Sequence, residues 1–153
     1  MPLSPASLKR LMELKVKDVM NPRPPTCKPE THVSELLKKF RTRKEDYVLV
    51  VNQNKKLLGI VTESDVLYAL KRPSRHMFIG AWAAREMIKI TASRAEEIMS
   101  KHPLTVHPEN TVREALDIMS THKFRHLPVT KEDKIVGAIS IRDIIEGMLK
   151  LKK

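Results

Sequence analysis

The chain contains two copies of one sequence pattern. Residues 59–65 read Gly-Ile-Val-Thr-Glu-Ser-Asp, and residues 137–143, which lie 78 positions later, read Gly-Ala-Ile-Ser-Ile-Arg-Asp. Upstream of these motifs the matches hold at a shift of 79, as between Met20 and Met99. A tandem duplication of this kind predicts two units that pack as pseudo-symmetric partners, because a short repeat buries its apolar face against its neighbour. A site built by one copy is therefore expected in the other.

The change of shift from 79 to 78 means that the second copy has lost one residue relative to the first. We place this loss in the connection after the first helix of each copy, where residues 41–46 face residues 120–124. With this alignment, Val50 takes the position that Pro128 has in the second copy.

The composition is that of a folded globular protein: of 153 residues, 41% are hydrophobic and 31% are charged. The longest nearly uncharged apolar run, 77–84, is too short to cross a bilayer, and the N-terminal residues lack the layout of a secretory signal. The single cysteine excludes an internal disulfide and suits a reducing compartment. We therefore expect a cytoplasmic protein without a membrane partner.

Each copy is expected to fold as a β-α-β-β-α unit preceded by a helical turn, so the fold class is α/β, of the α+β kind. Apolar runs of strand length joined by a polar turn predict a hairpin, and apolar residues at helical spacing predict the flanking helices. In the first copy these are strand 26–28, helix 31–43, strands 47–51 and 57–61, and helix 62–71. In the second they are helical turn 95–100, strand 104–106, helix 111–121, strands 127–130 and 135–140, and helix 141–149.

The chain divides into five segments by this interpretation. The connector between the copies carries so much apolar surface, in 77–82 and beyond, that we expect a helix packed on the pair or on another subunit. The segments are an N-terminal helical extension at 1–15, the first repeat at 16–71, the connector at 72–94, the second repeat at 95–149 and a basic tail at 150–153.

The junction between the last strand and the last helix of each copy carries a hydroxyl residue followed by an aspartate. Thr62 with Asp65, and Ser140 with Asp143, have the spacing of a helix capping box. The same geometry also provides an anion site, because the N–H groups at a helix N-terminus are unpaired. In addition, a carboxylate one turn into the helix can accept two hydrogen bonds from a vicinal diol such as ribose. These local residues leave both interpretations open.

The complete pattern resembles the cystathionine-β-synthase (CBS) domain, of which two in tandem form a CBS pair, or Bateman module. The resemblance rests on Met20-x8-Pro29 followed by Gly-Ile-Val-Thr-x-x-Asp65, and on Met99-x8-Pro108 followed by Gly-Ala-Ile-Ser-x-x-Asp143. It extends over residues 16–149. It implies a homodimer and a regulatory module without catalysis. The ligand would be an adenosine nucleotide (AMP, ADP or ATP) in energy sensing, and the regulated protein is not identified by the sequence.

The resemblance also implies two ligand clefts between the repeats. In each cleft the Asp would hold the ribose hydroxyls, the Ser or Thr would help to bind phosphate, and the first strand of the other repeat would line the base. The first cleft would use Ile60, Thr62, Ser64 and Asp65 with Leu104, Thr105 and Val106. The second would use Ala138, Ser140, Arg142 and Asp143 with Pro25, Thr26 and Cys27.

The two clefts are not expected to be equal. Similar proteins carry a phosphate-binding His-Arg pair, and this chain has Arg125-His126 there, which we assign to the Asp65 cleft. The equivalent residues in the first copy are Tyr47 and Val48, so the second cleft lacks these donors. The Asp65 cleft is therefore predicted to be the better phosphate site.

Two other classes of function stay open at this stage. The net charge of +11 would also suit a nucleic-acid-binding regulator that uses the basic stretch 38–44, although only six aromatic residues are present for stacking. Alternatively, the pair could serve only for oligomerisation, with empty clefts. We expect no metal site, because no cysteine or acidic cluster completes the histidine pairs. Cys27 is expected to be a small buried hydrophobe rather than a nucleophile.

Overall fold

A computed structural model describes residues 2–42, 46–71 and 93–151. The chain forms two compact units, which we call the terminal unit (residues 1–24 and 103–153) and the central unit (residues 25–102). Both combine helices with β-sheet, so the expected α/β class is confirmed. The predicted connector helix at 72–94, including the apolar stretch 77–82, falls almost entirely outside the described residues, as do residues 152 and 153 of the basic tail.

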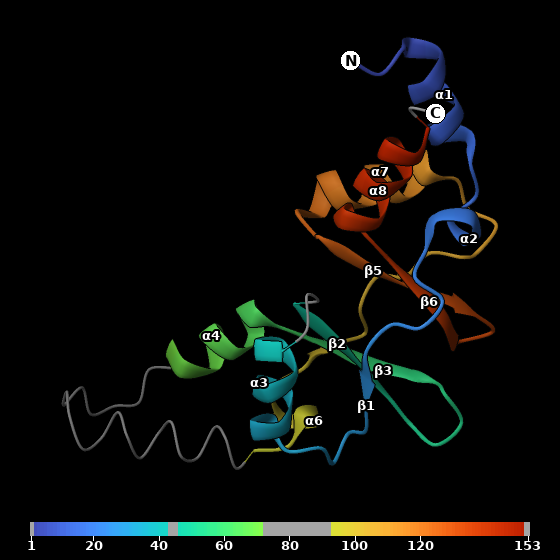
Figure 1. Cartoon of the computed structure of the whole chain (residues 1–153). Coiled ribbons are helices and arrows are strands. Elements are labelled where there is room, and N and C mark those ends of the chain that lie inside the picture. Colours follow the sequence, from blue (N-terminus) through green and yellow to red (C-terminus); the bar gives the residue numbers. More distant parts are fainter. Residues whose placement is uncertain (1, 43–45, 72–92, 152–153) are drawn as a thin grey trace. The chain divides into compact units, whose positions relative to one another are not determined.

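The central unit is a four-stranded sheet with helices (Figure 1). Its elements are β1 (Thr26–Cys27), α3 (Val33–Thr42), β2 (Tyr47–Val51), β3 (Leu57–Thr62), α4 (Glu63–Lys71), α6 (Ala95–Ile98) and β4 (Ser100–Lys101). The strand order is β1-β2-β3-β4, with β1 parallel to β2 and the other pairs antiparallel. The continuous apolar run of β2 is buried, which is typical of a strand covered on both faces.

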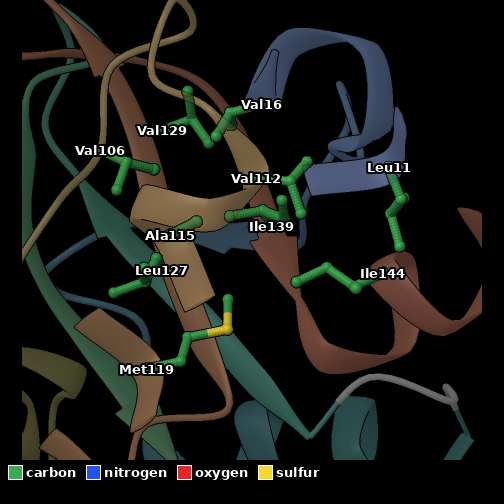
Figure 2. Packing of buried hydrophobic residues seen from close by; sticks show 10 residues of the cluster. All are labelled: Leu11, Val16, Val106, Val112, Ala115, Met119, Leu127, Val129, Ile139 and Ile144. Atoms are coloured by element: carbon green, nitrogen blue, oxygen red, sulfur yellow. The ribbon is translucent and has the colours of Figure 1, made fainter. Parts of the chain in front are cut away.

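The terminal unit contains the second hairpin and the N-terminal helices. Its elements are α1 (Pro5–Glu13), α2 (Val16–Val19), α7 (Val112–His122), β5 (His126–Lys131), β6 (Lys134–Ser140) and α8 (Ile141–Lys150). In Figure 1, α1 lies beside α7 and α8, although about a hundred residues separate them in the chain. The core shown in Figure 2 explains this contact, because Leu11 of α1 is buried with Val112 of α7 and Ile144 of α8.

The helical turn that precedes each copy packs in the unit that contains the other copy. In the terminal unit, the Val16 N–H of α2 donates to the Asn110 carbonyl at 2.7 Å. In the central unit, the equivalent Ala95 N–H of α6 donates to the Thr31 carbonyl, also at 2.7 Å. Two isolated bridges, Lys15 with Thr111 and His32 with Arg94, repeat this symmetry. The two copies therefore exchange their helical turns reciprocally within one chain.

A glycine in each hairpin makes this exchange possible. A Cβ atom on Gly59 would lie 2.5 Å from Met99 Sδ and 2.7 Å from the Ser100 carbonyl oxygen. A Cβ atom on Gly137 would lie 2.6 Å from Met20 Sδ and 2.9 Å from the Asn21 carbonyl oxygen. The two residues that follow each exchanged helical turn, which we call the exchanged segment, thus lie directly on the strand backbone, at a separation that only glycine permits. They are Met99-Ser100 and Met20-Asn21.

The prediction of a three-residue strand at 104–106 was wrong, because the pairing there is shorter. The structure has a single parallel bridge there, between Val106 and Val129. In the first copy the matching segment forms a short strand with two residue pairs, and the Leu49 N–H donates to the Pro25 carbonyl at 2.9 Å. Pro128 occupies the position of Leu49 in the second copy and has no N–H to donate, so the ladder stops.

The predicted position of the residue that the second copy has lost was also wrong. Leu49 pairs with Ile60 in the first hairpin and Pro128 pairs with Ala138 in the second. The first strands of the hairpins are therefore related by a shift of 79, and the shift becomes 78 only after the hairpin turn. The turn, not the connection between helix and strand, is one residue shorter in the second copy. Consequently, Tyr47 is the structural equivalent of His126.

Candidate functional site

The Thr62–Asp65 junction forms a capping box at the start of α4. Asp65 Oδ2 accepts hydrogen bonds from the Thr62 N–H at 2.8 Å and from Thr62 Oγ1 at 3.1 Å. The Asp65 N–H donates in turn to Thr62 Oγ1 at 3.4 Å. These bonds fix the carboxylate in one orientation at the N-terminus of the helix, where the helix dipole favours a negative charge.

The Ser140–Asp143 junction at the start of α8 repeats this arrangement in the terminal unit. Asp143 Oδ2 accepts from the Ser140 N–H at 2.8 Å and from Ser140 Oγ at 3.0 Å, and the Asp143 N–H donates to Ser140 Oγ at 3.1 Å. The capping interpretation is therefore realised in both copies. It does not exclude a ligand, because an ionised carboxylate offers about four lone-pair sites.

Ser100 adds a contact that sequence reasoning missed. Its Oγ donates to Asp65 Oδ1 at 2.6 Å, so the second carboxylate oxygen of Asp65 also has a protein partner. Ser100 reaches Asp65 because β4 pairs with β3 beside the junction, with Ser100 opposite Ile60. The equivalent residue of the other copy is Asn21, which lies opposite Ala138. A hydroxyl in one copy and an amide in the other distinguish the two sites.

Two predicted residues, Ser64 and Arg142, lie in the first turn of α4 and α8 and are both exposed. Ile60 is half-buried on β3, whereas Ala138 is fully buried on β6. The Ala138 side chain therefore serves the packing of the hairpin.

Arg125 and His126 lie at the same end of the second hairpin as Ser140. His126 is the register partner of Ser140, and the Arg125 carbonyl accepts a hydrogen bond from the Ile141 N–H at 3.0 Å. Both residues therefore belong to the terminal unit, whereas Asp65 belongs to the central unit. Their assignment to the Asp65 cleft stays a prediction.

The predicted base-lining segments differ in how much of each side chain is exposed. Val106 and Cys27, which are equivalent, are core residues of their units. Pro25 is buried as well, whereas Thr26, Leu104 and Thr105 are exposed. The core side chains hold the segments in place, so a ligand could use mainly the backbone and the exposed side chains.

Cys27 has the environment of a structural thiol. It is 7% exposed, and burial raises its pKa to about 11. A thiol with this pKa stays protonated near neutral pH, and the thiolate is the form that reacts. The expectation of a small buried hydrophobe is consistent with this environment.

Each predicted cleft takes its residues from both units. The Asp65 group lies in the central unit and its predicted base-lining residues, Leu104, Thr105 and Val106, lie in the terminal unit. The Asp143 group lies in the terminal unit, and its predicted base-lining residues lie in the central unit. These residues are Pro25, Thr26 and Cys27. The meeting of these halves stays a prediction.

Among the described residues, no group of three or more histidine, cysteine, aspartate or glutamate side chains is arranged to hold a metal ion. The helices in the described ranges are also too short or too polar to cross a bilayer.

Comparison with known proteins decides the family. The family model described as the CBS domain matches residues 16–72 and again residues 95–150, which together make up most of the chain. The chain belongs to the CBS-domain family. The predicted resemblance is thereby confirmed for both copies.

Relatives of similar size exist among curated proteins. An uncharacterized 17.7 kDa protein of Acidianus ambivalens is 27% identical over 139 residues, which cover 90% of this chain and 75% of the relative. The inosine-5'-monophosphate dehydrogenase of Aquifex aeolicus is 33% identical over 125 residues, but these cover 80% of this chain and only 22% of the enzyme. The similarity to that enzyme is thus limited to a small part of its length.

Solved CBS-pair structures have the same fold. The structure of CBSX2 in complex with AMP covers 91% of this chain and 98% of its own, with 25% identity and a TM-score of 0.74. CBSX2 is a CBS-pair protein from Arabidopsis thaliana. The Vibrio cholerae protein AcuB is 27% identical with a TM-score of 0.75, over 91% of this chain and 93% of its own.

Proposed function

We propose that this CBS pair is a non-catalytic, cytoplasmic regulatory module that binds adenosine nucleotides and senses the energy state of the cell for a partner protein. The observation that carries the proposal is the pair of equivalent junctions, in which Asp65 and Asp143 are each held at a helix N-terminus by a hydroxyl residue. The AMP complex of CBSX2, at 25% identity, supports an adenosine-type ligand.

The chemistry of the junctions suits a nucleotide. A fixed carboxylate with a remaining lone pair can accept a hydrogen bond from a ribose hydroxyl, and such a charge-assisted hydrogen bond contributes about 1.5–3 kcal/mol. The N–H groups of the first helical turn favour phosphate, and the net charge of +11 attracts it. We assign one ligand to Asp65, Thr62 and Ser64 with the 104–106 segment, and one to Asp143, Ser140 and Arg142 with the 25–27 segment.

Arg125 provides the test that separates nucleotide binding from nonspecific binding of polyanions. We expect Arg125→Ala to weaken binding of ATP by about tenfold, and that of adenosine hardly at all, because adenosine has no phosphate to lose. The affinities are measured by calorimetry for both ligands at two salt concentrations. Lys131→Ala, which removes another exposed cation of the same unit, is the control and should leave both affinities unchanged.

The competing function is binding of nucleic acid through the basic face of α3, where Lys38 and Arg41 are exposed. In that case a DNA duplex would bind tightly, and its affinity would fall steeply with salt because each phosphate contact releases counterions. Tight, salt-sensitive DNA binding without detectable nucleotide binding would reject the nucleotide proposal in favour of this one.

We also propose that the protein is a homodimer and that α8 contributes to the contact. Ile141, Ile145 and Leu149 follow one another at intervals of four along this helix and are 36%, 48% and 56% exposed. Residues four apart share one face of a helix, so these side chains form an apolar stripe that a second copy of the chain can cover.

The expected result for Ile145→Glu combined with Leu149→Glu is a monomer, because each chain would bring two carboxylates into the apolar contact. Light scattering at a protein concentration of about 10 μM, roughly ten times a micromolar Kd, should show twice the chain mass for the unaltered protein and the chain mass for the variant. Glu146→Gln, on the same helix, is the control and should remain dimeric. A monomeric unaltered protein would disprove the dimer.

A further inference from the structure

Asp65 has hydrogen-bond partners on both of its carboxylate oxygens. Oδ2 accepts from the Thr62 N–H at 2.8 Å and from Thr62 Oγ1 at 3.1 Å, so this oxygen closes the capping box. Oδ1 accepts from Ser100 Oγ at 2.6 Å. All three residues lie within 25–102, so this geometry involves the central unit alone.

The number of acceptor sites on Asp65 limits what a ligand can add. An ionised carboxylate has about two lone-pair sites on each oxygen. The two bonds from Thr62 fill those of Oδ2, whereas the bond from Ser100 fills one of the two on Oδ1. With the contacts of the described residues counted, one acceptor site remains, and it is on Oδ1.

The Ser100 contact lies at the surface and is strong. Ser100 is exposed and Asp65 is half-buried, so Oδ1 is the oxygen that a ligand would meet. A hydroxyl that donates to a carboxylate at 2.6 Å makes a short, charge-assisted hydrogen bond. A sugar hydroxyl that replaced Ser100 would form a bond of the same kind as the one that is lost. Replacement therefore contributes little net affinity.

The other copy has an amide at this place. Asn21, the equivalent of Ser100, uses its side-chain oxygen to accept a hydrogen bond from the Arg23 N–H at 2.9 Å. That oxygen therefore belongs to a turn of its own segment. Because the serine is particular to the first copy, its effect on a ligand is expected at the Asp65 site alone.

We propose that Ser100 limits Asp65 to one ribose hydroxyl, so that the Asp65 site selects for one hydroxyl of an adenosine nucleotide and tolerates loss of the other. The inference rests on the proposed function, in which the ribose lies against Asp65. One hydroxyl donates to the remaining acceptor site on Oδ1. The other is left to water or to neutral oxygens such as that of Ser100, and such hydrogen bonds contribute less than those to a carboxylate.

The test compares AMP, 2′-deoxy-AMP and 3′-deoxy-AMP by calorimetry on the full chain with Asp143→Ala, which weakens the other proposed site. We expect one deoxy form to bind within about threefold of AMP and the other to bind about tenfold or more weakly. This comparison needs no substitution at Ser100, so it tests the limit even if a variant at that position is poorly folded.

Substitution of Ser100 then tests the cause. Ser100→Ala should free the second acceptor site on Oδ1, so that AMP binds more tightly and both deoxy forms bind about tenfold or more weakly than AMP. Ser100→Thr keeps the hydroxyl donor and should retain the original pattern. Asn21→Ala, which removes the equivalent side chain of the other copy, is the matched control and should leave the ratios unchanged. Thermal unfolding checks that each variant is folded.

The outcomes separate this inference from the proposed function. Equal losses for the two deoxy forms with Ser100 in place would mean that Asp65 holds both hydroxyls, and no loss for either would mean that it holds neither. Both results overturn the inference while AMP is still bound. An unchanged pattern after Ser100→Ala overturns the role of Ser100. If AMP does not bind to the unaltered chain, the proposed function fails and the inference fails with it.

Discussion

The variant with both Asp65→Ala and Asp143→Ala is expected to lose detectable nucleotide binding. Each aspartate would contribute charge-assisted hydrogen bonds of about 1.5–3 kcal/mol to one ligand, so each single variant should weaken its own site by about tenfold to several hundredfold. Calorimetry on the two single variants and the double variant measures this. Unchanged affinity in the double variant would reject the ribose-binding role of these residues.

The control for this prediction must account for helix capping. Both aspartates also accept hydrogen bonds at their helix N-termini, so their removal should lower the free energy of unfolding by about 1 kcal/mol each. Thr111→Ala removes a comparable cap, since Thr111 Oγ1 accepts from the Glu114 N–H at 3.2 Å, but it lies in α7 without a proposed ligand role. It should lower the melting temperature similarly and leave nucleotide affinity unchanged.

The second large effect is expected from Gly59→Ala and Gly137→Ala. In both, the new methyl group would overlap a methionine sulfur and a backbone carbonyl of the exchanged segment. The sulfur can move, but the carbonyl belongs to a segment paired with the same strand, so the segment must shift. Overpacking of this kind costs about 1–3 kcal/mol, and thermal unfolding should show a melting temperature lower by several degrees.

Gly147→Ala is the matched comparison for this effect. Its Cβ atom would lie 3.3 Å from a methyl group of Leu11 in a flexible side chain, and alanine favours the helix by about 1 kcal/mol. We expect little change in melting temperature. If all three variants melt alike, the close approach at the two hairpin glycines has no special energetic role.

Helices and strands could be predicted from the sequence where a short stretch of residues determines them. Apolar runs such as 47–51 and the polar turn after them define a hairpin without reference to the rest of the chain, and the structure has strands there. The strand at 104–106 failed because its length depends on a partner, Pro128, that cannot donate a hydrogen bond. The lost residue was misplaced for a similar reason, since only the register of paired strands locates it.

In the candidate site, too, the contacts between residues close in sequence were predictable and the long-range contact was not. The Thr62–Asp65 and Ser140–Asp143 contacts span three residues, so their spacing alone predicted the geometry. The Ser100–Asp65 contact spans 35 residues and depends on β4 pairing beside β3. The one available signal was the repeat, because Met99-Ser100 matches Met20-Asn21. The assignment of each residue to a cleft and the cytoplasmic location stay predictions.

The reciprocal exchange also sets the order in which the protein can fold as it is synthesised. The central unit is one continuous segment, 25–102, so all of its residues are translated before the second half of the terminal unit is made. During that interval α1 and α2 have been translated but lack the hairpin and helices that later cover Leu11 and Val16. Helices α1 and α2 are therefore expected to pack last. Their apolar side chains are exposed during translation and would be available to a chaperone that binds nascent chains.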